Sequence, residues 1–114
     1  MTEKGLKYLS DIIQAIELIE DFTKSITSYS DYVNDLKTQS AVERQLGIIG
    51  EAVNKLNTLD PDESLENTQK IVGFRNRLIH AYDAVDPSMV WAILKKHLDP
   101  LKDEAKSKTD LYIK

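Results

Sequence analysis

Apolar residues recur at every third or fourth position along most of the chain, which is the spacing of amphipathic α-helices. The first such segment predicts a helix over about residues 5–24, with charged and polar residues between the apolar ones. Its apolar positions are Leu6, Leu9, Ile12, Ile13, Ile16 and Ile19. Residues 25–30 are rich in hydroxyl side chains, and Ser30-Asp31 is expected to form a turn and a new helix N-cap.

A second helix is predicted over about residues 38–59, where the spacing of apolar residues forms a continuous seam for packing on another helix. The seam consists of Val42, Leu46, Ile49, Val53 and Leu56. Gly47 and Gly50 lie inside this helix, where a glycine costs about 1 kcal/mol relative to alanine. Glycines that are present despite this cost indicate that a neighbouring backbone approaches the helix closely there. Glycines that are simply tolerated would give the same sequence pattern.

Two breaks that contain proline delimit the remaining helices. Asp60-Pro61-Asp62 ends the second helix, and a third is predicted from about Glu66 to His80 or just beyond. Its expected buried residues are Ile71, Val72, Phe74, Leu78 and Ile79. Asp86 and Pro87 are residue types preferred at the N-cap and the first position of a fourth helix. The apolar residues of this helix are Val90, Ile93, Leu94, Leu98 and Leu101.

The C-terminal part of the chain is less regular. Pro100 removes one helical hydrogen bond and is expected to bend or break the fourth helix near Lys96. The tail, residues 102–114, is charged and is expected to fray, although its apolar residues 111–113 are able to dock. The whole pattern predicts an all-α protein, an up-and-down four-helix bundle forming a single domain over residues 1–114.

Composition and charge narrow the classes of function. The net charge of −4 argues against a surface coated with phosphate-binding groups, so any contact with nucleic acid must use a local basic site. The absence of cysteine excludes disulfides and thiolate metal sites. No N-terminal segment has the pattern of a signal peptide, and no apolar run approaches the roughly 20 residues of a membrane span. A cytoplasmic protein without a membrane segment is therefore expected.

Residues with strong hydrogen-bonding capacity gather where the third helix is expected to end. Arg75, Asn76 and His80 fall within six residues, with Arg77 and Tyr82 beside them. Asn76 and His80 share a helix face, whereas Arg75 and His80 point roughly 140° apart on an ideal helix. Arg75 and His80 can act on one ligand only if the last turn of the helix is distorted, or if two copies of the chain each supply part of the site.

These residue types suit the cleavage of RNA without a metal ion. A guanidinium grips a phosphate and stabilises its charge, and histidine transfers protons near neutral pH. The spacing alone favours a simpler interpretation, in which a solvated arginine stands beside a histidine that caps the helix C-terminus.

A wider set of residues changes this balance. The segment 74–83, Phe-Arg-Asn-Arg-Leu-Ile-His-Ala-Tyr-Asp, closely resembles the signature of HepT-like HEPN toxins, in which Arg and His are separated by four residues and Tyr follows two residues later. Ile49-Gly50-Glu51-Ala52 resembles the second-helix motif of that family. Asp86-Pro87 followed by Val90-Trp91 is similar to the family's restart into the fourth helix. The similarity extends from Tyr8 to about Leu101 and implies a HEPN-type bundle.

The resemblance also implies a function. Members of that family form homodimers that bring two motifs together as a metal-independent endoribonuclease site, and no cofactor is expected. They are toxins paired with a small nucleotidyltransferase antitoxin that can attach AMP to the motif tyrosine. Carried over to this chain, Arg75 would stabilise the scissile phosphate, His80 would transfer protons, Asn76 would orient both, and Tyr82 would be modified. The alternative is a non-catalytic subunit of a minimal nucleotidyltransferase that binds nucleotide phosphate with the same motif.

Other polar and aromatic residues have simpler interpretations. Glu51 is either a solvated or interhelical charge or a partner of Arg75 in the same or a second chain, and Arg77 either supports the site or is merely exposed. His97 is interpreted as a histidine at the edge of the core, because two histidines on different helices do not suggest a metal site. Trp91 is expected to pack in the core or an interface rather than to stack on bases. Lys95-Lys96 is expected to form a solvated face rather than a track for RNA.

Overall fold

The computed structural model describes residues 2–113, and most of this range is helical. The α-helices are α1 (Glu3–Phe22), α2 (Tyr29–Val33), α3 (Leu36–Leu59), α4 (Gln69–His80), α5 (Pro87–Lys96) and α6 (Leu98–Ile113). Two short 3-10 helices, η1 (Pro61–Glu63) and η2 (Tyr82–Ala84), lie before and after α4. Residues 2–113 contain no β-strand, which confirms the prediction of an all-α protein.

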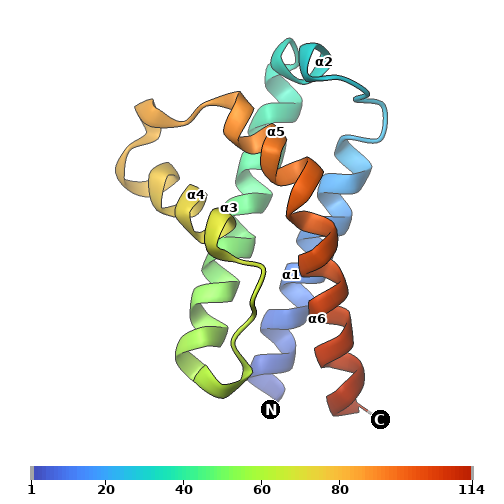
Figure 1. Cartoon of the computed structure of the whole chain (residues 1–114), viewed down its shortest axis with the longest axis vertical. Helices are drawn as coiled ribbons and strands as arrows, with labels where there is room; N and C mark the ends of the chain where they lie inside the picture. The colour runs from blue at the N-terminus through green and yellow to red at the C-terminus, as the bar shows by residue number, and fades with distance from the viewer. Residues whose placement is uncertain (1, 114) are drawn as a thin grey trace.

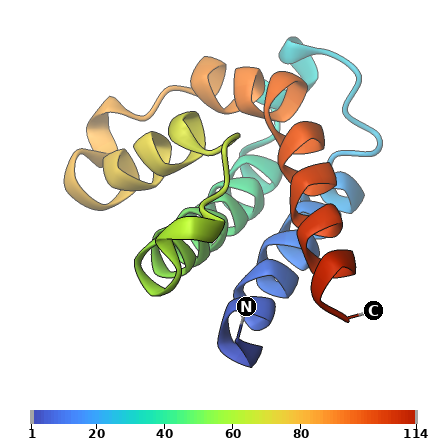
Figure 2. The ribbon, with the colours of Figure 1, turned by 60° about the horizontal axis from the view of Figure 1, so that its bottom comes forward.

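The helix α3 holds the bundle together (Figure 1). It packs against α1 on one side and against α4 on the other, while α6 packs along α1. Figure 2, in which the bottom of the molecule comes forward, shows α4 on one side of α3, and α1 and α6 on the other. α5 lies between α4 and α6 along the chain and contacts both. Any side chain on the outer surface of α4 is therefore flanked by α3 on one side and α5 on the other.

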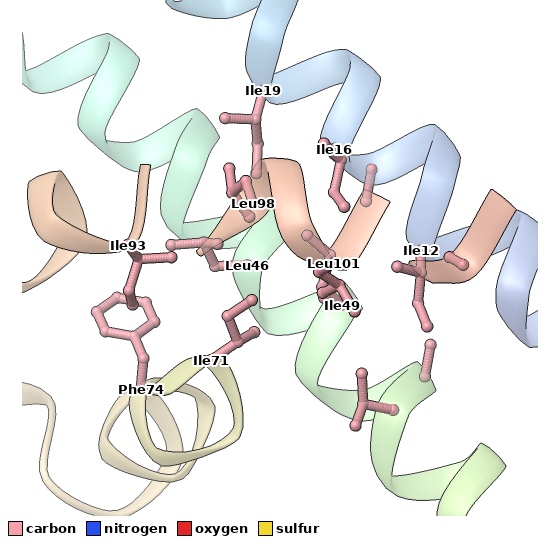
Figure 3. Packing of buried hydrophobic residues seen from close by; sticks show 14 of the residues in the cluster. Ile12, Ile16, Ile19, Leu46, Ile49, Ile71, Phe74, Ile93, Leu98 and Leu101 are labelled. Atoms are coloured by element: carbon pink, nitrogen blue, oxygen red, sulfur yellow. The ribbon is translucent and has the colours of Figure 1, made fainter. Parts of the chain in front are cut away.

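One apolar core joins these helices, and it consists largely of the positions predicted from helical periodicity. The seam of α3 is fully buried, as predicted, at Val42, Leu46, Ile49, Val53 and Leu56. Figure 3 shows how Ile71 and Phe74 of α4 meet Leu46 and Ile49 of α3, with Ile93 of α5 beside Phe74. None of the helices described in residues 2–113 is both long enough and apolar enough to cross a membrane.

The first turn region differs from the prediction by two residues. Ser28, not Ser30, is the N-cap of α2, and its hydroxyl accepts a hydrogen bond from the backbone N–H of Asp31 at 3.1 Å. Ser30 lies inside the helix. The segment 25–30 offers several hydroxyl groups that can cap a helix, so composition alone does not select among them.

The start of α4 also differs from the prediction, by three residues. The helix begins at Gln69 instead of Glu66, because a carboxylate of α6 engages the preceding backbone. Glu104 accepts hydrogen bonds from the backbone N–H of Glu66 at 2.8 Å and from that of Asn67 at 3.2 Å. The contact joins residues far apart in the sequence, so local patterns do not contain it.

The C-terminal region follows one expectation and departs from another. α5 starts after Asp86 as predicted, and the helix breaks between Lys96 and Leu98, which confirms the break expected from Pro100. The segment expected to fray is helical as far as Ile113, where the described residues end. Ala105 is buried there, and ion pairs from Lys102 to α1 and from Lys108 to Glu63 tie the helix to the bundle.

Candidate functional site

Gly50 brings α4 unusually close to α3 at Arg75. A Cβ atom built on Gly50 would lie 2.5 Å from the Cβ of Arg75 and 2.9 Å from its Cγ. A Cβ on Gly47 would lie 3.6 Å from the Cδ1 of Leu78, which is an ordinary contact. The expected close approach is therefore confirmed at Gly50 and is mild at Gly47. Because α4 lies so close, the start of the Arg75 side chain is held against α3.

From this contact, the Arg75 side chain extends to Glu51, which follows Gly50 on α3. Its guanidinium donates a hydrogen bond to the Glu51 carboxylate, and a second one to the Asn76 side-chain oxygen at 3.3 Å. Glu51 also has Lys55 nearby, with 3.7 Å between nitrogen and oxygen. The Arg75 side chain remains 24% exposed, so an anion from solution can reach it. Of the pairings open for Glu51, the structure shows the one within the same chain.

His80 occupies the last position of α4 and is exposed. The final turn is regular, since the backbone N–H of Ala81 donates to the carbonyl of Arg77 at 2.9 Å. The distortion that would turn His80 toward Arg75 is thus not present in residues 2–113. One chain therefore carries Arg75 on the α3 side of α4, and His80 with Asn76 on the outward face.

Tyr82 stands just past the end of α4, in η2, and 61% of its surface is exposed. Its hydroxyl donates a hydrogen bond to Oε1 of Glu43 on α3 at 3.1 Å. This hydrogen bond, and the negative charge of Glu43, raise the pKa of the Tyr82 phenol. Two carboxylates of α3, at positions 43 and 51, thus hold two residues of the motif. Sequence reasoning missed Glu43, whose only signal was its separation of about two helical turns from Glu51.

Arg77 points away from Arg75. It lies on the α5 side of α4, where its Nη1 is 3.7 Å from the sulfur of Met89. Two residues along a helix correspond to a rotation of about 200°, so the two arginines lie on opposite sides of α4. The structure therefore brings Arg75, Asn76 and Glu51 together, and it separates Arg77 from them.

Ile79 corrects a prediction about the core. It was expected to be buried, but 56% of its surface is exposed. Ile71 and Phe74 define the face of α4 that is turned to the core, and Ile79 falls at the edge of that face, one turn after Arg75. On α3, Ile48 is 37% exposed and lies three residues before Glu51. The ion pair of Arg75 and Glu51 is thus flanked by an exposed isoleucine on each helix.

The structure also shows the surroundings of Trp91 and His97, the remaining residues considered from the sequence. Trp91 packs against Tyr29 and Tyr32, with the Lys95 ammonium 4.5 Å from its ring centre, so its interpretation as a packing residue is confirmed. His97 is partly buried at the C-terminal end of α5. Within residues 2–113, no three His, Asp or Glu side chains are grouped closely enough to hold a metal ion.

Comparison with known proteins places the chain in a family. A family described as "Ribonuclease HepT-like" matches residues 12–107. A protein of Thermococcus cleftensis named "Probable ribonuclease HepT" is 42% identical over 99 residues, which cover 83% of this chain and 86% of that protein. "Putative RNase MJ1380" of Methanocaldococcus jannaschii is 36% identical over 107 residues, covering 91% of this chain and 96% of its own length. No solved structure matches the chain.

Proposed function

Because the chain belongs to the HepT-like ribonuclease family of HEPN proteins, we propose that it is a metal-independent endoribonuclease, the toxin of a toxin–antitoxin pair. RNA is the substrate, and two copies of the chain form each site. The observation that carries the proposal is the arrangement of Arg75 and His80 in the C-terminal half of α4: Arg75 is partly exposed beside α3, and His80 is exposed on a different side of the helix.

The chemistry follows from the groups present. The 2′-hydroxyl of the RNA attacks the adjacent phosphorus, and the bond from that phosphorus to the 5′-oxygen breaks. The products end in a 2′,3′-cyclic phosphate and a 5′-hydroxyl. Arg75 stabilises the negative charge that develops on the phosphate, and His80 transfers a proton during the reaction. Asn76, whose side-chain oxygen accepts a hydrogen bond from Arg75, orients the guanidinium.

Cleavage can be tested directly with the purified protein. The products of a defined RNA are analysed in the presence of EDTA, which removes divalent metal ions. We expect cyclic phosphate ends and a loss of about 10²- to 10⁴-fold in rate for His80→Ala, with a comparable or larger loss for Arg75→Ala. Cleavage that survives both substitutions, or that stops in EDTA, would contradict the mechanism.

A homodimer accounts for the exposed apolar residues beside the ion pair. Ile48 and Ile79 offer apolar surface next to Glu51 and Arg75. A twofold axis at this surface would place the same residues of a second copy against them. Such an axis also allows His80 of one copy to approach Arg75 of the other, which one regular helix does not allow.

A mixing experiment distinguishes a shared site from a site within one chain. Each single variant, Arg75→Ala or His80→Ala, lacks a group in every site. A mixed dimer of the two variants has one complete site if each site takes Arg75 from one copy and His80 from the other. Unfolding and refolding an equal mixture should restore about a quarter of wild-type activity, because half of the dimers are mixed and have one complete site. No recovery in a mixture shown to contain mixed dimers would contradict the shared site.

Tyr82 is proposed as the point of control. A partner nucleotidyltransferase would attach AMP to it: the phenol oxygen bonds to the α-phosphorus of ATP, pyrophosphate leaves, and the Glu43 carboxylate accepts the phenolic proton. The support is that Tyr82 is exposed and its hydroxyl already donates to Glu43. The phosphodiester carries about one negative charge, which would repel the RNA backbone, while the nucleotide blocks the approach to the site.

Tyr112 provides a matched control for this modification. It is also an exposed tyrosine whose hydroxyl donates to a glutamate, Glu63, but it lies on α6. The protein is incubated with its proposed partner nucleotidyltransferase, ATP and magnesium, and its intact mass is measured. Tyr82→Phe should abolish the gain of AMP, Glu43→Gln should slow it, and Tyr112→Phe should leave it unchanged. A gain of AMP that persists in Tyr82→Phe would contradict the assignment.

A non-catalytic role is a second candidate, favoured by the net charge of −4, which disfavours the binding of a long RNA. In that role the motif binds nucleotide phosphate for a nucleotidyltransferase, and the phosphate displaces Glu51 from Arg75. In that case nucleotide binding would depend on Arg75, and no RNA would be cut by the wild-type protein.

A further inference from the structure

A groove lies on the side of α4 opposite to Arg75. It consists of two adjoining hollows, of about 480 and 320 Å³, that share Lys70, Phe74, Arg77 and Met89. The larger one extends along α5 to Lys96 and His97. The smaller one extends along α4 to Gly73 and Gln69. We call the two together the α4–α5 groove.

The charge of the groove is positive, in contrast to the chain as a whole. Lys70, Arg77 and Lys96 line it, and none of its lining residues is an aspartate or a glutamate. Within residues 2–113, these three cations have no carboxylate within 4.0 Å. Many of the cations elsewhere are neutralised by such pairs, namely Lys7, Lys24, Lys55, Arg75, Lys102 and Lys108. An acidic protein thus leaves three uncompensated cations around one hollow.

The walls of the groove between the cations are apolar. Met89, Ala92 and Ile93 of α5 line it, and Phe74 of α4 contributes from the core side. The Nη1 of Arg77 is 3.7 Å from the sulfur of Met89, so its guanidinium stands at the edge of this apolar surface. A nucleotide unit has a flat apolar base and an anionic phosphate, and it fits a surface that combines these two features.

The groove also lies close to the outward face that carries the motif histidine. Along an ideal helix, Arg77 and His80 are about 60° apart, whereas Arg75 lies about 140° from His80 on the other side. His80 therefore stands between Arg75 and the groove. Along the axis of α4, Arg77 lies about 4.5 Å and Lys70 about 15 Å from His80. A strand whose scissile phosphate reaches the motif therefore meets Arg77 first and needs a few more nucleotides to reach Lys70.

We propose that the α4–α5 groove binds the phosphate backbone of the single-stranded RNA substrate, next to the site of cleavage. This inference rests on RNA as the proposed substrate, but not on its being cut. It also revises the interpretation of Lys95-Lys96 as one solvated face. Lys95 covers Trp91, whereas Lys96 lines the groove.

The test is a binding measurement with matched charge changes. One variant carries Lys70→Gln, Arg77→Gln and Lys96→Gln. Its control carries three substitutions of exposed lysines outside the groove, Lys4→Gln, Lys37→Gln and Lys106→Gln, with the same change in net charge. Both sets are made in a His80→Ala background, so that the RNA stays intact. Affinity for a fluorescein-labelled single-stranded RNA is measured by anisotropy over a range of salt concentrations.

The expected effect follows from counterion release. Each contact to single-stranded nucleic acid contributes about 0.7 to the slope of log affinity against log salt, or about 5-fold in affinity at 0.1 M salt. Losing three contacts should raise the dissociation constant about 100-fold and reduce the slope by about 2. The control set should change the dissociation constant by no more than a few-fold. Equal losses in the two sets would overturn the proposal.

Three further outcomes separate the alternatives. If poly-glutamate binds the wild-type protein as tightly as the RNA does, and loses that binding in the groove variant, the groove serves an acidic protein partner and the proposal is wrong. If the wild-type protein cuts no RNA but the groove variant still loses RNA affinity, the proposed nuclease function fails and the groove assignment stands. If RNA is cut and the groove variant binds it as wild type does, the groove assignment alone fails.

Discussion

Replacing Gly50 by alanine should push α4 away from α3 and disturb Arg75. The new Cβ would meet the Cβ of Arg75 at 2.5 Å, whereas carbon atoms in contact are about 3.5–4.0 Å apart. The Arg75 Cβ is fixed to its backbone, so no change of side-chain rotamer relieves the overlap. The two helices must separate locally by about 1 Å to restore a normal contact.

The cost in stability is the difference between two opposing terms. Overpacking of this kind typically costs about 1–3 kcal/mol, while alanine gains about 1 kcal/mol over glycine in a helix interior. Gly50→Ala should therefore lower the free energy of unfolding by up to about 2 kcal/mol. Arg75→Ala keeps the Cβ atom, so this loss should persist in the double variant. Because α4, and with it Arg75, would be displaced from its position in the site, RNA cleavage should also fall.

Two other glycines provide internal controls. Gly47→Ala places its Cβ in ordinary contact with Leu78, and Gly73→Ala meets nothing within 4 Å. Both should therefore raise the free energy of unfolding, by about 0.5–1 kcal/mol. Urea denaturation followed by far-ultraviolet circular dichroism compares all three variants. If Gly50→Ala proves as stable as Gly47→Ala, the close approach does not constrain the two helices and the reasoning is refuted.

Three further predictions concern polar groups away from the motif. Tyr32 is fully buried, and its hydroxyl has no hydrogen-bond partner within residues 2–113. Tyr32→Phe should therefore raise the free energy of unfolding, measured by urea denaturation, by about 1 kcal/mol. A destabilised variant would contradict this. Glu104→Ala should lower the free energy of unfolding by about 1 kcal/mol. It should also speed amide exchange at residues 66 and 67, because the Glu104 carboxylate accepts hydrogen bonds from their backbone N–H groups. Unchanged exchange at these residues would contradict the prediction. A hydrogen bond from Tyr112 holds the pKa of the Glu63 carboxyl below its ordinary value of 4.5. The ionised Glu63 carboxylate therefore stabilises the fold above pH 4.5, and this stabilisation is lost as the pH falls through the lowered pKa. The amide protection of residues 108–113 should therefore fall on acidification in the wild-type protein, and Glu63→Gln should remove this dependence.

Local sequence patterns predicted the helices where burial follows a regular period. The seam of α3 was predicted residue by residue, because a helix packed between α1 and α4 must keep apolar side chains at a fixed spacing. The break after Lys96 was predictable because proline cannot donate a backbone hydrogen bond. The start of α4 was not, because it depends on Glu104, a residue of another helix.

The same distinction applies to the functional residues. Arg75 and His80 were identified from a contiguous motif and its family resemblance. For Glu51, the sequence left several interaction partners open. Glu43 became a candidate only when the structure placed it at the Tyr82 hydroxyl. The groove was not predictable either, because its cations come from two helices and become neighbours only when α5 packs against α4. Ile79 was assigned to the core because periodicity does not locate the edge of a buried face to within one residue.

The ion pair of Arg75 with Glu51 also affects which anions the protein can bind. The carboxylate is part of the same folded chain, so it faces the guanidinium at a high effective concentration that a dissolved small anion does not match. An anion must displace Glu51 or use the N–H groups that it leaves free. A single small anion competes poorly with the attached carboxylate. A strand anchored through neighbouring phosphates competes well, because its own phosphate also arrives at high effective concentration. The internal carboxylate is therefore expected to make Arg75 favour polyanionic chains over small anions.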